Sequence, residues 1–242
     1  MNSYGLIDLH CDTLAEYWKY AHTGNPDTLD DPGRVLSLSN MPKDVHWAQF
    51  YAVFIPDEER GQAAIDCFEK NRANFYRQME KFGDRVAPCR NADDMEKAWA
   101  AGKTAAFLTI ENGSVLAGDL SRVHTLAEQG VRAITLTWNG ENELGSGHTT
   151  DHGMSEFGKA AVREMEKENI LVDVSHLNDP GRGSAGGRDE ALRRHALQRP
   201  RAVQPQAQPD GRHDPRDGAP RLPDRSELLC EVPARRRRRK EP

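Results

Sequence analysis

The chain changes its composition at about residue 180, and this change limits how much of it can fold. Residues 181–242 contain no Ile, Met, Phe, Trp or Tyr, yet they hold 15 Arg and 8 of the 14 Pro. Such a segment cannot bury enough apolar surface to offset the conformational entropy that folding costs. We therefore expect a folded domain in residues 1–180 and a disordered Arg/Pro-rich tail in residues 181–242.

The net charge changes at the same point. Residues 1–180 carry 17 basic and 29 acidic side chains (net −12), whereas residues 181–242 carry 16 and 9 (net +7). The tail includes the basic run at residues 235–240, and basic runs bind nucleic acid or acidic surfaces. Because no aromatic residues interleave with these arginines and no recognition motif accompanies them, we expect no nucleic-acid partner.

Neither a signal peptide nor an apolar stretch long enough to span a membrane is visible in the sequence. The four cysteines, Cys11, Cys67, Cys89 and Cys230, form no Cys-x-x-Cys pair and no disulfide-framework spacing. We therefore expect reduced thiols and a cytoplasmic location.

Strand-length apolar runs alternate with helix-length amphipathic stretches through residues 1–180. Strands are predicted at residues 6–10, 47–55, 104–110, 133–138 and 170–174, and helices at residues 58–81, 91–102, 120–129 and 157–168. Strands that are apolar on both faces are typical of a parallel sheet covered by helices. A closed (β/α)8 barrel has eight strands, so we expect an α/β fold of the TIM-barrel type that is incomplete, with about five of its units present.

Side chains that bind metals lie at the ends of three predicted strands. His10 and Asp12 end the first strand, and they project to the same side because strand side chains alternate. Glu111 follows the strand at residues 104–110, and His176 ends the strand at residues 170–174. The carboxyl ends of parallel barrel strands meet at one edge, where barrel active sites are built. Imidazole and carboxylate groups at that edge suit a divalent transition metal, zinc above all.

Each of these residues also has a structural interpretation. Asp12 or Thr13 suits the N-cap of a helix, Glu111 suits a turn before Asn-Gly, and a lone histidine such as His176 is usually a polar loop residue. Three strand ends that present such residues together favour a metal site over coincidence.

Five segments occur in the order that one family of metallopeptidases shows. They are LIDLHCDT at residues 6–13, IENG at 110–113, GVRAITLT at 130–137, GMSEFG at 153–158 and VDVSH at 172–176. Together they resemble the membrane dipeptidase (renal dipeptidase) family, in particular its shorter bacterial members, and the resemblance covers residues 5–180. It implies a (β/α)8 barrel with two zinc ions that hydrolyses dipeptides through a metal-bound hydroxide.

The same resemblance implies a role for each candidate ligand. His10 and Asp12 bind one zinc, His176 binds the other, and Glu111 bridges the two ions and is the catalytic residue. Trp138 stands where many family members have a substrate-orienting histidine, so no substrate-binding residue is assigned.

Other expected parts of the family pattern have no counterpart in register. His148 and His152 lie in a nearby Gly/Thr/Ser-rich loop and are interpreted as loop histidines. After residue 180 the chain lacks a second zinc histidine within T-H-S-N-A-R-A, a substrate-binding arginine and a catalytic aspartate.

A shift of one nucleotide would account for these absences. Residues 194–199 can be encoded so that the frame one nucleotide further on reads A-T-H-S-N. In that frame residues 207–215 can read R-N-L-T-D-D-M-I, and residues 221–233 can read G-F-L-I-G-V-N-F-C-A-K-F-L. All three strings resemble the family's next segments. We therefore hypothesise a frameshift between about residues 176 and 203, centred on residues 178–187.

The sequence thus predicts a zinc-dependent dipeptidase whose activity is impaired or absent in this chain. One zinc would lack a histidine, and the open apolar sheet edges favour association into a homo-oligomer. Two alternatives remain: another metal-dependent amidohydrolase, acting on cyclic amides or phosphoesters, and a non-catalytic remnant with a basic binding tail.

Overall fold

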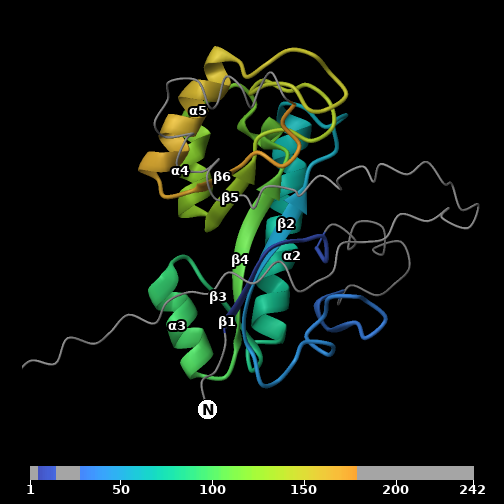
Figure 1. Ribbon diagram of the computed structural model, residues 1–242, viewed down its shortest axis with the longest axis vertical. Coiled ribbons are helices and arrows are strands. Elements are labelled where there is room, and N and C mark those ends of the chain that lie inside the picture. The colour runs from blue at the N-terminus through green and yellow to red at the C-terminus, as the bar shows by residue number, and fades with distance from the viewer. Residues whose placement is uncertain (1–4, 15–27, 179–242) are drawn as a thin grey trace, which may run out of the picture.

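A parallel β-sheet organises the chain (Figure 1). The computed structural model describes residues 5–14 and 28–178, so the predicted tail at residues 181–242 lies outside the described residues. The strands run in the order β1-β2-β4-β5-β6, with β3 beside β4, and every pairing is parallel. They are β1 (Gly5–Cys11), β2 (His46–Phe54), β3 (Val86–Pro88), β4 (Thr104–Glu111), β5 (Val131–Thr135) and β6 (Leu171–Asp173). The predicted fold class, an incomplete TIM-type barrel, is confirmed.

The predicted number of five strands is wrong, because the described residues form six. The additional strand, β3, is three residues long and ends in Pro88, so its sequence has no periodicity that predicts a strand. It pairs with the first residues of β4, whereas β5 pairs with β4 from Leu108 onward. The extra strand therefore shares one side of β4 with β5 and leaves the order of the other strands unchanged.

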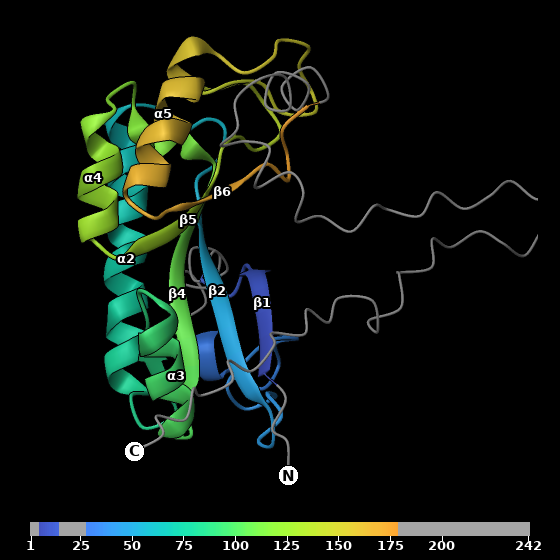
Figure 2. The ribbon, with the colours of Figure 1, turned by 60° about the vertical axis from the view of Figure 1, so that its left-hand side comes forward.

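Most of the helices cover one face of this sheet (Figure 2), whereas α3 (Ala92–Ala100) adds Ala98 to a smaller apolar cluster on the other face. Two of them begin at side-chain caps: Asn91 Oδ1 accepts a hydrogen bond from Asp94 N (2.9 Å), and Ser155 Oγ accepts one from Gly158 N (2.8 Å). The first α-helix of the described residues begins four residues later than predicted, because the chain turns after Pro56. The α-helices are α2 (Gln62–Lys81), α3 (Ala92–Ala100), α4 (Ser121–Glu128) and α5 (Glu156–Lys167), and the 3-10 helices are η1 (Thr28–Asp30) and η2 (Gly113–Leu116).

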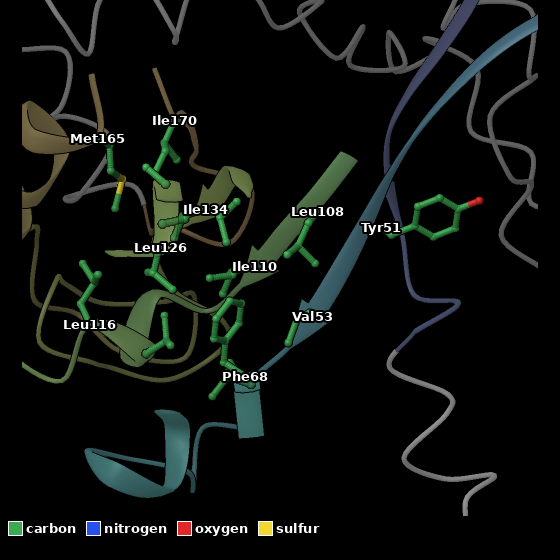
Figure 3. Close-up of a cluster of buried hydrophobic side chains, with 14 of the residues drawn as sticks. Tyr51, Val53, Phe68, Leu108, Ile110, Leu116, Leu126, Ile134, Met165 and Ile170 are labelled. Carbon is green, nitrogen blue, oxygen red and sulfur yellow. The ribbon is translucent and has the colours of Figure 1, made fainter. Parts of the chain in front are cut away.

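The main core lies between the sheet and helices α2, α4 and α5 (Figure 3). On the opposite face of β4, Phe107 stacks on Phe50 of β2, with 4.6 Å between ring centroids. Both faces of β4 are therefore buried, as predicted for a parallel sheet. Glu111 has the strand parity of Phe107, so it projects from the face that points away from the main core. The main core includes Leu108, Ile110, Ile134, Phe68, Leu126 and Met165.

Helix α5 approaches the preceding loop closely at Gly158. A Cβ atom at this position would collide with the backbone oxygen of Leu144. We expect Gly158→Ala to lower the free energy of unfolding by at least about 2 kcal/mol, because backbone must move to admit the methyl group. Urea titration followed by circular dichroism measures this, with the solvent-side Lys159→Ala as the control. A loss no larger than that of the control would contradict the packing described.

The described part of the sheet does not close. Strands β1 and β6 each have a strand on one side only, and Leu9 and Leu171 remain 63% and 41% exposed. These are the two open edges that the sequence predicts. Among the described helices, none is both long enough and apolar enough to cross a membrane.

Candidate metal centre

The candidate metal ligands lie at the carboxyl ends of β1, β4 and β6. His10 is the second-last residue of β1, and Asp12 follows that strand directly. Glu111 is the last residue of β4, because the strand extends one residue further than predicted. His176 lies in the turn after β6. Parallel strands place these ends at one edge of the sheet, so the fold brings together residues that are far apart in sequence.

The Glu111 carboxylate lies between the two histidines. Its Oε2 is 3.7 Å from His10 Nε2, and its Oε1 is 3.1 Å from His176 Nε2. His10 Nε2 is in turn 3.3 Å from Asp12 Oδ1. The ligand atoms of His10, Asp12 and Glu111 all lie within 4.8 Å of one another, close enough to hold one metal ion. The Glu111 carboxylate thus presents one oxygen to each histidine.

Burial makes the centre unfavourable for an unpaired negative charge. The Glu111 side chain is 8% exposed, and burial raises its pKa to about 7. The positive charge of His10 lowers this pKa, whereas the negative charges of Asp12 and Asp173 raise it. The side-chain hydrogen bond between His10 and Asp12 raises the pKa of His10, although burial lowers it. Burial lowers the pKa of His176, which favours the neutral imidazole that binds metals. These donors fit a divalent cation, which would supply the positive charge that the buried carboxylate lacks.

Metal binding at this centre should strengthen as the pH rises. A metal must displace the protons that Glu111 and His10 hold at raised pKa values. We expect the zinc dissociation constant to fall about tenfold per pH unit for each proton displaced, and to level off above the pKa of Glu111. Competition with a chelating dye between about pH 6 and pH 8 measures this, after correction for the dye's own protonation. A constant that does not change with pH would exclude displacement of protons from these groups.

Other residues that the sequence singled out lie either near the centre or on the surface. His148 is exposed in a loop, and its ring lies 6.1 Å from that of His176. Trp138 packs edge-on against Phe54 at 4.9 Å and lies 6.5 Å from the His176 ring. His152 contacts Glu141 at 2.9 Å on the surface. The three described cysteines are free thiols, as predicted, and Cys230 lies outside the described residues.

Four residues near the centre received no role from the sequence. Asp173 accepts hydrogen bonds from Thr135 Oγ1 (2.8 Å) and Ser175 N (2.9 Å), and its charge acts on both histidines. Asp57, Asn112 and Asn142 are joined by hydrogen bonds beside Glu111. The Asn112-Gly113 pair signals a turn in the sequence, but nothing local predicts its partners.

The sequence matches the model of the membrane dipeptidase family, peptidase family M19, over residues 1–182. The chain belongs to this family. The resemblance predicted from five short segments is thereby confirmed, and the matched region ends where the composition changes. Membership of a metallopeptidase family agrees with the carboxylate and imidazole donors that the fold gathers at one edge.

Solved structures show the same fold. The metallopeptidase from Rhodobacter sphaeroides, liganded with a phosphinate mimic of the dipeptide L-Ala-D-Ala, matches with a TM-score of 0.67 and 19% identity over 80% of this chain and 62% of its own. Dipeptidase AC, of family M19, matches with a TM-score of 0.67 and 20% identity over 80% and 60%. An amidohydrolase from Pseudomonas aeruginosa matches with a TM-score of 0.52 and 24% identity over 59% and 42%. This chain thus spans 42–62% of the length of these proteins.

Proposed function

We propose that the carboxyl edge of this sheet is the zinc centre of a dipeptidase, and that the complete barrel hydrolyses the peptide bond of dipeptides. The observation that carries this proposal is the buried Glu111 carboxylate, with one oxygen toward each histidine. His10, Asp12 and Glu111 would hold one ion, and Glu111 and His176 the other. When bound, zinc polarises a carbonyl group and lowers the pKa of water.

The surroundings of the centre suit a small substrate. A cavity of about 310 Å³ borders Asp12 and is also lined by Thr13, Arg34 and Leu36. Of the four candidate ligands only Asp12 lines this cavity, and its volume is at the lower end of the range for small-molecule pockets. The dipeptide mimic bound by the Rhodobacter sphaeroides protein supports the same class of substrate.

We further propose that the present chain has little or no dipeptidase activity. Catalytic zinc sites commonly have three protein ligands. The first site meets this number, whereas the described residues give the second only Glu111 and His176. The hypothesis of a frameshift near residues 178–187 explains the shortage, since the shifted frame can encode a T-H-S-N segment.

Purified chain, loaded with Zn²⁺ and assayed with L-Ala-D-Ala, tests both parts of the proposal. We expect zinc to bind and hydrolysis to be far slower than in an intact family member. Absence of zinc binding would contradict the proposed metal centre. Turnover near that of an intact relative would contradict the proposed loss of activity. Faster hydrolysis of a cyclic amide or a phosphoester than of any dipeptide would favour the alternative amidohydrolase. Cytoplasmic location and homo-oligomer formation stay predictions.

A further inference from the structure

The amide of Asn112 connects three loops directly behind the candidate metal centre. Its side chain is fully buried, and its backbone φ is 80°, a region that glycine adopts readily and asparagine more often than most residues. Nδ2 donates to Ile55 O (2.9 Å) and to Asp57 Oδ1 (3.2 Å). Oδ1 accepts from Ser114 N (3.2 Å) and from Asn142 Nδ2 (2.9 Å). All four hydrogen-bonding positions of this amide are therefore used.

The four partners come from the segments that follow three strands: Ile55 and Asp57 follow β2, Ser114 follows β4 and Asn142 follows β5. Asp57, after β2, also accepts a hydrogen bond from Gly140 N (2.8 Å) in the loop after β5. Asn142, in that same loop, donates to Leu136 O (2.8 Å) and accepts from Leu144 N (2.8 Å). Asn112 itself follows β4 directly. These hydrogen bonds join the three loops through the fully buried amide of Asn112, so they fix the loops relative to one another.

Glu111 depends on this network for its position. Among the described residues, its carboxylate forms ion pairs with His10 and His176, and these ion pairs alone do not fix its backbone. Its backbone is held instead: Glu111 O accepts a hydrogen bond from Ile55 N (3.0 Å), and the next residue is Asn112. A change in the backbone at Asn112 would therefore turn the carboxylate away from one histidine.

We infer that Asn112 is a positioning residue that sets the direction of the Glu111 carboxylate between His10 and His176, and so sets the affinity of the centre for metal. The inference rests on the proposed function, because it treats Glu111 as a metal ligand. The four hydrogen bonds of the Asn112 amide go to the loops and none goes to a histidine, so Asn112 acts through Glu111 and the loops.

The test compares Asn112→Gly with Asn71→Ala in the full chain. Glycine keeps the backbone conformation and removes the amide, while Asn71 is a second buried asparagine, on α2, whose Nδ2 donates to Cys67 O (2.9 Å). We expect Asn112→Gly to raise the dissociation constant for Zn²⁺ about 10- to 100-fold, as for other groups that orient metal ligands. The visible absorption of bound Co²⁺ should change as well. Asn71→Ala should lower the melting temperature but leave zinc affinity and the Co²⁺ spectrum unchanged.

A milder variant, Asn142→Ala, tests the inference if Asn112→Gly fails to fold. Asn142→Ala removes one acceptor contact of Asn112 and leaves the other three, so we expect a smaller loss of zinc affinity with the same sign. Wild-type affinity and Co²⁺ spectrum in whichever variant folds would overturn the inference and leave the proposed function intact. Absence of zinc binding by the unaltered chain would overturn the proposed function, and the inference with it.

Discussion

Removing one nucleotide from the codons for residues 178–187 should raise dipeptidase activity at least about 100-fold above that of the present chain. The described residues give the second metal only Glu111 and His176, and the shifted frame can supply the histidine of a T-H-S-N segment. The same frame can encode an apolar run in place of residues 221–233, which suits a strand beside an open edge of the sheet. The measurement is the rate of L-Ala-D-Ala hydrolysis per zinc-loaded protein.

Two matched variants of the coding sequence control this experiment. Removing one nucleotide only at the codon for Arg235 leaves residues 1–234 unchanged, so the activity should stay at the level of the present chain. Inserting one nucleotide near residue 180 produces the third frame, which should also stay inactive. Sequencing that finds no T-H-S-N in the shifted frame, or a restored chain with no gain in activity, would contradict the frameshift.

Replacing Glu111 by Gln should strongly weaken metal binding while stabilising the metal-free protein. The amide keeps the shape of the side chain but removes the charge that bridges the two proposed ions, so we expect zinc affinity to fall at least about 100-fold. Without metal, the buried carboxylate has a raised pKa of about 7 against its ordinary value of 4.5. That difference corresponds to a cost of up to roughly 3 kcal/mol when Glu111 is ionised.

The sign of the pH dependence follows from the raised pKa. A group that holds its proton more tightly in the folded state adds stability below its unfolded pKa, and this is lost as the pH rises toward 7. The raised pKa of His10 acts in the same direction. The metal-free chain should therefore melt at a lower temperature at pH 8 than at pH 5, and Glu111→Gln should reduce this difference.

Calorimetry at the two pH values measures the effect, and zinc competition measures the affinity. Glu141→Gln, at a surface carboxylate that contacts His152, is the matched control and should change neither result much. If Glu111→Gln bound zinc as tightly as the unaltered chain, Glu111 would not be a ligand.

Local sequence patterns predicted most of the elements because each pattern depends on burial. Two-sided apolar runs at β2 and β4 identified buried parallel strands, and the helix predicted from residue 91 is α3, which begins at Ala92. Strand β3 was missed because its three residues form a strand only through pairing with β4. The start of α2 was misplaced because the turn after Pro56 keeps the next residues out of the helix.

The sequence by itself determined the family, the parallel α/β architecture and the identities of His10, Asp12, Glu111 and His176 as candidate ligands. It did so because these side chains follow apolar strands whose direction is common to the whole sheet. Only the tertiary structure decided that Glu111 lies between the histidines and that Asn112 holds its backbone through the loops after β2 and β5. Those distances depend on how the strands are ordered and twisted in space, and no local pattern in the sequence contains that information.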